Sequence, residues 1–360
     1  MNRIILADIR STNTDGRSVG HGPAVARNYA ALYADEPRFY VAGGPIYRTE
    51  RLPRLLRLPF SVLSSDSRLL TGFKSLINGL FLLCRSRGDT VIFQSYSVAI
   101  IIFLLALRRW NCRILLIQYY HQITESPLLR RLYRRAQRHL DGVICPLPDI
   151  GQALERPYIV VPDYLYLASP APACPKRVDF GIYGILAHGK GITDVARSFV
   201  GTPFHLAIAG RPSEVLPEDR AAMQELRELC RNAPNITLAE GYMSDEEYER
   251  RLSETKYIIL NYRENYEDRS SGCILDALYH RCPVIAHRLR STAFVGEEGI
   301  GLLINRAEEL TPACLQHLLQ PEVYAAYGEA LERFLAGAQE QHRALREFIC
   351  PQCNIMAPDF

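Results

Sequence analysis

Short apolar runs alternate with polar and amphipathic stretches along the first half of the chain. Each run has the length of a strand, and the first is followed by a polar loop and then by a helical pattern at about residues 23–33. Buried strands that alternate with helices are typical of parallel sheets, so the pattern predicts an α/β fold. The strands expected in this half are residues 4–7, 39–42, 91–94, 114–118, 142–145 and 158–161.

The same alternation starts again after residues 168–176, ASPAPACPK. This stretch is rich in Ala and Pro, as expected of an exposed connection between domains. We therefore expect two α/β domains, residues 1–168 and residues 169–339. The second domain starts with DFGIYGIL, whose Gly184 opens a first loop that runs to Gly191, and the strands expected after it are residues 204–209, 236–239, 257–260 and 283–286.

The composition agrees with a globular protein of two domains. The chain has 360 residues, of which 48% are hydrophobic and 22% are charged, and no low-complexity tract interrupts it. Its longest apolar stretch, residues 98–107, is only half as long as a membrane span, and its start has too short an apolar core for a signal peptide. The ten cysteines follow no disulfide framework, so we expect reduced thiols and a cytoplasmic protein.

Charge is divided unevenly between the two halves. Residues 1–168 contain 22 Lys and Arg against 12 Asp and Glu, whereas residues 169–360 contain 20 against 27. Arginines and leucines cluster at residues 48–58 and 130–140, and such segments can lie on the anionic inner face of a membrane. The alternative is a solvated, Arg-rich helix face. No nucleic-acid-binding motif accompanies the charge, so nucleic acid is not the expected partner.

Polar chemistry is most concentrated at residues 262–286, YRENYEDRSSGCILDALYHRCPVIA. Asp268 and Asp276 are eight positions apart, and a Ser-Ser-Gly sequence between them opens a run with helical spacing. The N-terminus of such a helix presents backbone N–H groups and a dipole that favour a phosphate. Asp276, one turn later, can accept hydrogen bonds from sugar hydroxyls. An ordinary amphipathic helix with two solvated aspartates is the alternative.

This segment resembles the donor site of GT-B glycosyltransferases, particularly family 4, in which Glu, seven residues and Glu precede a helix and a Pro-Val strand. Asp268 and Asp276 stand at the two Glu positions, and Pro283 stands at the position of the proline. Arg281 replaces the Gly that usually precedes the strand. The resemblance implies two Rossmann-like domains that face each other across a cleft. It also implies a last helix, at about residues 340–360, that packs back on the first domain.

A second loop, GILAHGKG, begins at Gly184 and resembles the Gly-Arg and Lys-Gly pattern of the same family, whose Arg and Lys neutralise the donor diphosphate. Lys190 matches the Lys, but Ile185 occupies the position of the Arg. Because a departing diphosphate needs positive charge nearby, either another cation substitutes or activity is impaired. Arg269 and His188 are the nearest candidates along the sequence.

The resemblance also assigns roles to further loops. A His at the end of a first-domain strand contacts the donor sugar in that family, and His121 stands in the corresponding position. The Gly-containing loop after the first strand faces the donor phosphates, and a Gly-Tyr-Met loop of the second domain touches the base through its backbone. The residues added to the expected donor site in this way are Gly20, Gly22, Gly210, Gly241, Tyr242 and Met243.

As a whole, the resemblance implies a glycosyltransferase that moves a sugar, with retention of configuration, from a nucleotide-sugar to a hydroxyl of a saccharide. Lys190 and the helix start at Ser270, Ser271 and Gly272 would stabilise the departing diphosphate. Asp276 would hold the ribose, and Asp268 would lie near the transferred sugar.

The sequence also bears on metal use, on the acceptor and on alternative functions. No DxD sequence occurs in a setting that suggests a metal site, and no essential metal or cofactor is expected. The basic first domain favours a lipid-linked acceptor and peripheral membrane contact, and the rival is a soluble small-molecule acceptor. A nucleotide-sugar epimerase on the same fold and a non-catalytic GT-B partner of another transferase are the alternative functions.

Overall fold

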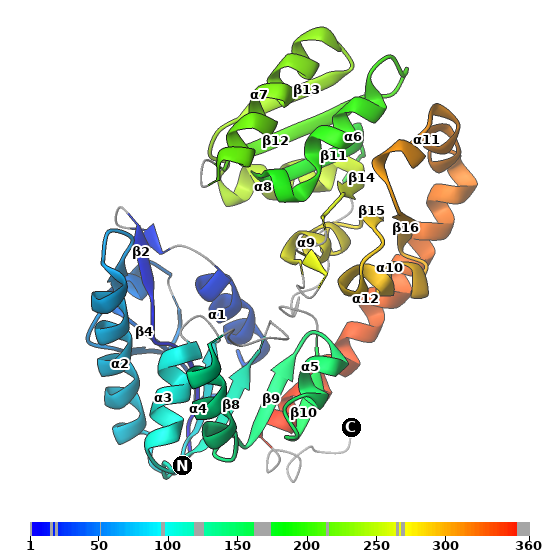
Figure 1. Ribbon diagram of the computed structural model, residues 1–360. Helices are drawn as coiled ribbons and strands as arrows, with labels where there is room; N and C mark the ends of the chain where they lie inside the picture. Colours follow the sequence, from blue (N-terminus) through cyan, green and yellow to red (C-terminus); the bar gives the residue numbers. More distant parts are fainter. Residues whose placement is uncertain are drawn as a thin grey trace. The chain divides into compact units, whose positions relative to one another are not determined.

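The computed structural model describes residues 2–14, 17–18, 21–50, 52–94, 98–118, 126–161, 174–213, 216–263, 266–267 and 271–350 (Figure 1). The chain divides into two compact units. The first comprises Met1–Ala168 and Ala338–Phe360, and the second comprises Ser169–Gly337. The last helix, α12 (Pro321–Ile349), is continuous and contributes residues to both.

The first unit is organised around a parallel sheet. In the part of the chain that is described, its strands are β1 Ile4–Asp8, β4 Phe39–Gly43, β5 Leu55–Arg57, β7 Thr90–Gln94, β8 Arg113–Ile117, β9 Gly142–Cys145 and β10 Tyr158–Val160. They are ordered β10-β9-β8-β7-β1-β4-β5, and every pair is parallel. The strand order reverses between β1 and β7, which is the switch point of a doubly wound sheet.

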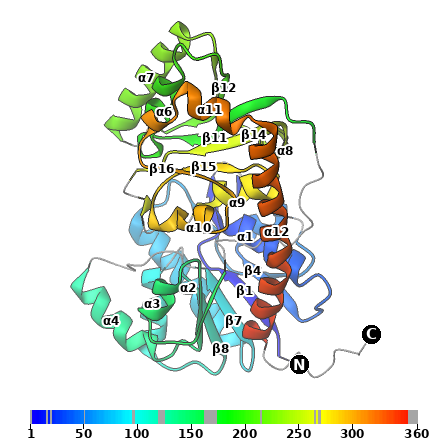
Figure 2. The same ribbon diagram turned by 90° about the vertical axis from the view of Figure 1, so that its right-hand side faces the viewer.

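Three helices cover one face of this sheet. The helices of the unit are α1 His21–Leu32, α2 Arg68–Arg85, α3 Val98–Leu107, α4 Pro127–Gln137 and α5 Pro148–Gln152, with the 3-10 helix η1 Pro45–Glu50. α3 lies between α2 and α4 (Figure 1 and Figure 2). Inward residues of the three helices, such as Leu82, Ile101 and Ala136, share a core with Ile5 and Phe93 of the sheet. Burial in this core explains why the strands in the first half of the sequence are short apolar runs.

The end of α12 packs on the same unit. The Phe348 ring occupies the space above Gly142, where an added Cβ would lie 2.6 Å from its tip. Arg113 of β8 donates a hydrogen bond to the carbonyl oxygen of Phe348 over 2.8 Å. These contacts fix the last turn of the helix to β8 and β9.

Short strands near β1 were not predicted. β2 (Thr12–Thr14) and β3 (Arg17–Ser18) form an antiparallel hairpin, and β2 also pairs in parallel with β6 (Val62–Leu63). Strands of two or three residues are too short to show a period in the sequence. The same reason explains why β5 at the sheet edge was not predicted.

The second unit repeats the arrangement of the first. Within the described residues, its strands are β11 Val178–Leu186, β12 Leu206–Pro212, β13 Ile236–Glu240, β14 Thr255–Leu260, β15 Val284–His287 and β16 Gly301–Ile304. They form a parallel sheet in the order β13-β12-β11-β14-β15-β16. Its order reverses between β11 and β14, so a ligand is expected beyond the carboxyl ends of these two strands.

The largest core cluster of the second unit lies on one face of its sheet. The helices here are α6 Ile192–Phe199, α7 Pro217–Asn232, α8 Asp245–Glu254, α9 Gly272–Tyr279, α10 Ala293–Glu297, α11 Pro312–Leu318 and the first part of α12, with 3-10 helices η3 His188–Lys190, η5 Arg290–Thr292 and η6 Ala307–Glu309. Phe180 and Ile182 of β11 pack against α6, α7 and α11. Alternate residues such as Tyr183 point to the opposite face, where its hydroxyl meets Thr255 at 2.9 Å.

Two doubly wound parallel sheets confirm the expected α/β class with two Rossmann-like domains. Among the helices that the structure describes, none is long and apolar enough to span a membrane. The described cysteines form no disulfide bond with one another. No group of three His, Cys, Asp or Glu side chains in the described ranges is arranged to hold a metal ion.

Candidate donor site

Lys190 lies where three expected parts of the site meet. Gly184, in β11, has a φ of +107°, and a Cβ added there would lie 3.8 Å from Nζ of Lys190 and 3.9 Å from Sγ of Cys273. Cys273 is the second residue of α9. The amine, the glycine of β11 and the first turn of α9 therefore converge at the switch point of the sheet.

The backbone around Lys190 is fixed from two sides. Gly191 has a φ of +58°, and a Cβ there would collide with the backbone oxygen of Asn261 directly after β14. The side-chain amide of Asn261 donates a hydrogen bond to the carbonyl oxygen of Gly191 over 3.2 Å. The backbone N–H of Arg263 donates to the carbonyl oxygen of Gly189 over 3.0 Å. The loop after β11 is thus tied to the segment after β14.

Asp219 anchors the same loop from α7. One of its carboxylate oxygens accepts a hydrogen bond from the backbone N–H of His188 at 2.9 Å, and the other accepts from the Ser213 hydroxyl at 2.5 Å. The hydrogen bonds from Ser213 and from the backbone of His188 and Leu216 hold the pKa of Asp219 below its usual value. This residue was not predicted, because nothing in the sequence links α7 to a loop some thirty positions earlier.

Tyr262 forms the buried floor beside Lys190. It is 1% exposed, stacks on Tyr266 with ring centroids 4.3 Å apart, and lies with its own centroid 5.9 Å from Nζ of Lys190. Burial raises its pKa, so the hydroxyl stays protonated. That hydroxyl and the Ser271 hydroxyl are 2.7 Å apart. Ser271 precedes α9 but does not cap it with its side chain, so the first N–H groups of the helix are not satisfied in this way.

Asp276 lies one turn into α9, as expected. Its carboxylate is half-buried and accepts a hydrogen bond of 3.0 Å from the hydroxyl of Tyr248 on α8. α8 begins after Ser244, whose hydroxyl accepts from the backbone N–H of Glu247 at 3.2 Å. A carboxylate held in this way retains oxygen lone pairs for sugar hydroxyls.

The expected glycine loops lie at the same edge of the sheet. Gly210 was expected after β12, but the strand extends through it to Pro212, and a Cβ at Gly210 would collide with the carbonyl oxygen of Gly184. Gly241, at the end of β13, donates its N–H to the carbonyl oxygen of Gly210 over 2.9 Å. Tyr242 is 71% exposed. Met243, which follows it, is half-buried.

Arg211 is a cation that the sequence analysis missed. Its Cα is the in-register partner of Ile185, which is 59% exposed on β11. Arg211 is exposed and forms no ion pair with a residue in the described ranges. No property of the sequence shows this proximity, because it depends on the register between β11 and β12.

In the first unit, a carboxylate occupies the space next to Gly22. A Cβ at Gly22 would lie 2.7 Å from the carboxylate oxygen of Asp8 that accepts a hydrogen bond from the Tyr47 hydroxyl at 2.8 Å. The other oxygen of Asp8 accepts from the backbone N–H of Ser11 at 2.9 Å. Burial raises the pKa of Asp8. Gln94, at the end of β7, donates to the carbonyl oxygen of Gly22 over 3.4 Å. The glycine accommodates this carboxylate, and its contact with a donor phosphate stays a prediction.

Other predicted site residues lie outside the described part of the chain. These are Gly20, His121, Asp268, Arg269 and Ser270. Their expected roles stay predictions. Of the two cations proposed to replace the missing Arg, only His188 is described, and its backbone rather than its side chain is what Asp219 binds.

Solved structures share this fold over nearly the whole chain. Sucrose-phosphate synthase from Thermosynechococcus elongatus matches with a TM-score of 0.69 and 16% identity, over 98% of this chain and 100% of its own. Anabaena HepE in complex with UDP matches with a TM-score of 0.66 and 11% identity, over 98% and 100%. A trehalose-6-phosphate synthase studied for glycosyltransfer with retention matches with a TM-score of 0.65 and 10% identity, over 97% and 99%.

Comparison of sequences alone gives no such match. No protein-family model and no curated protein sequence matches the chain. At the identities found, the solved structures establish the fold and nothing finer. The chain therefore has the two-domain GT-B fold of glycosyltransferases, in agreement with the resemblance seen at the donor segment.

Proposed function

We propose that the protein is a glycosyltransferase that uses a nucleotide-sugar donor. The observation that carries the proposal is the convergence of Lys190, Gly184 and the start of α9 at the switch point of the second sheet. A cation, a glycine that admits close approach and a helix N-terminus are together suited to a diphosphate. Solved structures with this fold have been obtained with UDP and with UDP-2-fluoro glucose.

The residues at the site have separate tasks in this reaction. The bond between the anomeric carbon and the diphosphate oxygen breaks as the acceptor oxygen bonds to that carbon. Negative charge develops on the diphosphate, which takes up the proton that the acceptor hydroxyl loses. Lys190, Arg211 and the N-terminus of α9 stabilise this charge. Asp276, held by Tyr248, binds the ribose hydroxyls. His121 and Asp268 act on the transferred sugar.

We assign the reaction to the retaining class and the acceptor to lipid-linked saccharides of a surface polysaccharide or glycoconjugate. Retention is supported by the paired-carboxylate pattern of Asp268 and Asp276 and by the trehalose-6-phosphate synthase of the same fold. The lipid-linked acceptor is supported by the positive charge of the first unit, since anionic lipids attract such a surface. The protein then works as a peripheral membrane protein at the cytoplasmic face.

A panel of nucleotide-sugars tests the proposal. The full chain is incubated with each donor, with and without extracted lipid-linked saccharides, and release of nucleoside diphosphate is followed. We expect release that depends on one donor and increases with acceptor. Conversion of a donor to its epimer without acceptor would instead identify an epimerase. Binding of a donor without release would identify a non-catalytic partner.

A further inference from the structure

Helix α2 extends beyond the core on which it packs, and the extension is apolar. Its buried residues begin at Ser75. Before that point, Leu69 is 88% exposed, Phe73 is 57% exposed and Leu70 is 42% exposed. Leu69 and Phe73 are four residues apart and so share one side of the helix. A helix end that stays in water is expected to carry polar residues on this side instead.

The segment before the helix adds to this surface. Phe60 is 37% exposed and Leu63 is 43% exposed. Leu63 belongs to β6, which pairs with β2, and β2 follows the carboxyl end of β1. We call the five residues Phe60, Leu63, Leu69, Leu70 and Phe73 the α2 patch. The patch therefore lies at the carboxyl edge of the first sheet, the edge at which ligands bind in doubly wound sheets.

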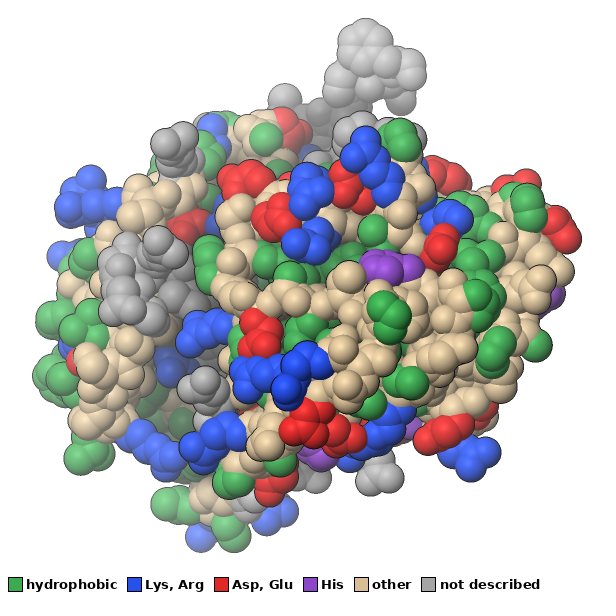
Figure 3. Space-filling view, turned by 90° about the horizontal axis from the view of Figure 1, so that it is seen from above, with side chains coloured by type: hydrophobic (Ala, Val, Ile, Leu, Met, Phe, Trp, Pro, Cys, Tyr) green, Lys and Arg blue, Asp and Glu red, His purple; other side chains and the backbone are tan. Residues whose placement is uncertain are grey.

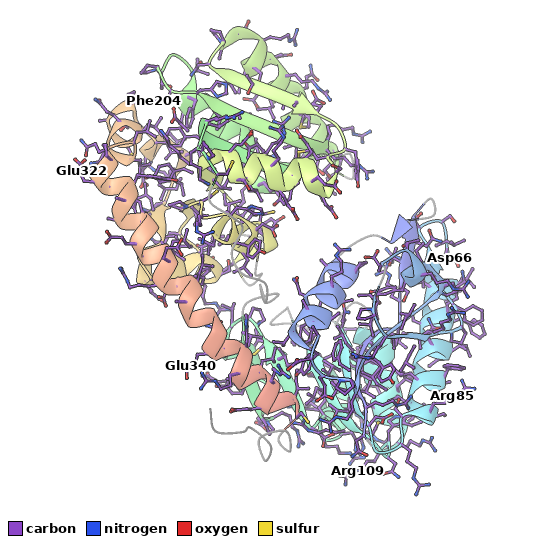
Figure 4. All side chains as sticks on the ribbon, turned by 180° about the vertical axis from the view of Figure 1, so that it is seen from behind. Asp66, Arg85, Arg109, Phe204, Glu322 and Glu340 are labelled. Carbon is purple, nitrogen blue, oxygen red and sulfur yellow. The ribbon has the colours of Figure 1, made fainter. Side chains whose placement is uncertain are left out.

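The opposite edge of the same helix layer offers a position for a control. Asp66, just before α2, and Arg85, its last residue, mark the two ends of the helix in Figure 4, and Arg109 lies beyond the end marked by Arg85. Leu107, the last residue of α3, is 53% exposed near Arg109. It offers an exposed leucine of the same layer away from the α2 patch.

The net positive charge of the first unit arises from the segment that contains α2, α3 and α4. Residues 68–140 contain 12 Lys and Arg against two Asp and Glu, a net charge of +10. The other residues among 1–168 contain ten of each sign, so they add nothing. α2, α3 and α4 contain no acidic residue. By contrast, the face seen in Figure 3 carries positive and negative side chains close together. Ion pairs of the second unit include Arg197–Glu225 and Arg227–Glu240.

The two Arg-Leu clusters found in the sequence contribute charge rather than apolar surface. In α4, Ala136 is buried and Leu132 packs against the core, so the exposed side carries mainly arginines, with Leu128 at the start of the helix 68% exposed. At residues 48–58, Leu58 is 3% exposed, and Arg54 donates a hydrogen bond to the backbone oxygen of Glu36 over 3.0 Å. The two clusters therefore supply little apolar surface for contact with a membrane, and the α2 patch supplies more of it.

We infer that the α2 patch inserts into the interfacial region of an anionic lipid bilayer while the arginines of α4 and Arg68 lie over its headgroups. Apolar side chains beside a cationic surface are the combination that such interfaces bind. A second copy of this chain is a less suitable occupant, because two surfaces of the same sign would repel each other. Binding to the membrane would not depend on the proposed function. The role of this binding does rest on it, since that role is to bring the carboxyl edge of the first sheet to a lipid-linked acceptor.

Vesicle flotation of the full chain tests the inference. The vesicles contain equal parts of phosphatidylglycerol and phosphatidylcholine, and the test variant is Leu69→Ser with Phe73→Ser. We expect the parent to bind and the variant to bind on the order of a hundredfold more weakly, because two large apolar side chains no longer leave water. The matched control, Leu107→Ser, should bind as the parent does.

Salt separates the apolar contribution from the electrostatic one. Replacing Arg130, Arg131, Arg134 and Arg135 by Ala should weaken binding at low salt by at least about tenfold and change little at high salt, since salt screens these charges. The Leu69→Ser, Phe73→Ser variant should instead lose the binding that survives high salt. Equal binding by this variant, Leu107→Ser and the parent would overturn the inference.

Two further outcomes would also overturn it. One is a parent that does not bind the vesicles at low salt. The other is a parent that sediments as a dimer which Leu69→Ser with Phe73→Ser dissociates, since a second copy then covers the patch. Circular dichroism and Trp110 fluorescence of the same variant, measured without vesicles, show that it is folded. Because vesicle binding needs no donor, failure here is distinct from failure of the proposed function.

Discussion

Ile185 and Arg211 are in-register partners on the neighbouring strands β11 and β12, so their side chains leave the sheet on the same face. The two backbones are separated by about 4.8 Å, the spacing of adjacent strands. An arginine at either position can therefore reach a similar region beyond the carboxyl edge. We propose that Arg211 in this way supplies the cation that isoleucine at residue 185 does not.

The first prediction concerns moving the arginine from residue 211 on β12 to residue 185 on β11. Arg211→Ala should weaken nucleoside diphosphate binding on the order of tenfold, because a charge-assisted contact is lost. Adding Ile185→Arg to this variant should restore most of the affinity. Isothermal titration measures both. Arg177→Ala, at the amino edge of β11, is the control and should bind normally. No loss in Arg211→Ala would exclude Arg211 from the site.

Removal of the central amine is the second prediction. Lys190→Ala should weaken donor binding and turnover by roughly ten- to a hundredfold and leave the fold intact. Lys256→Ala is the matched control, because Lys256 pairs with Asp179 at 2.8 Å near the amino ends of β14 and β11. Circular dichroism checks the fold. Turnover of Lys190→Ala at the parent's rate would show that the site is assigned wrongly.

The carboxylate on α9 gives the third prediction. Asp276→Ala should raise the donor KM on the order of tenfold or more, because the sugar hydroxyls lose their acceptor. Tyr248→Phe removes only the 3.0 Å hydrogen bond that orients the carboxylate and should have a smaller effect in the same direction. Steady-state kinetics with varied donor distinguish the two. An effect of Tyr248→Phe larger than that of Asp276→Ala would contradict the assigned roles.

Much of the candidate site can be predicted from local sequence, but the residues that join it from other elements cannot. The loop with Gly184 and Lys190 and the start of α9 are contiguous segments with their own chemistry, so the sequence predicts them. Arg211 depends on strand register and Asp219 on the packing of α7, and neither has a local pattern. The fold class follows from alternating apolar runs, whereas the short strands β3 and β6 have too few residues to show a period.

The fourth prediction concerns acid stability of the second unit. His280 is buried at the end of α9, with its Nδ1 2.8 Å from the Ser253 hydroxyl, and burial together with the charge of Lys176 lowers its pKa to about 4. An unfolded chain takes up this proton below pH 6.5, the ordinary value, whereas the folded chain does so only near pH 4. The histidine's contribution is thus complete above pH 6.5 and is lost as the pH falls towards 4.

Replacement of this histidine should flatten that dependence. Between pH 6.5 and pH 4 the parent should lose at most about 3 kcal/mol more unfolding free energy than His280→Gln. Urea unfolding followed by circular dichroism measures the difference. Fluorescence of Trp110, the one tryptophan of the sequence, reports on the first unit and should be unaffected by the replacement. Equal pH dependence of parent and variant in both signals would contradict the prediction.

Donor binding decides whether the carboxyl edge of the second sheet holds the diphosphate of a nucleotide-sugar. The measurement is calorimetric titration of the full chain with a panel of nucleoside diphosphates, repeated with Lys190→Ala. We predict that one nucleoside diphosphate binds at one site per chain and that Lys190→Ala weakens it on the order of ten- to a hundredfold. Absence of binding by every member of the panel, or equal binding by the parent and Lys190→Ala, would contradict the account.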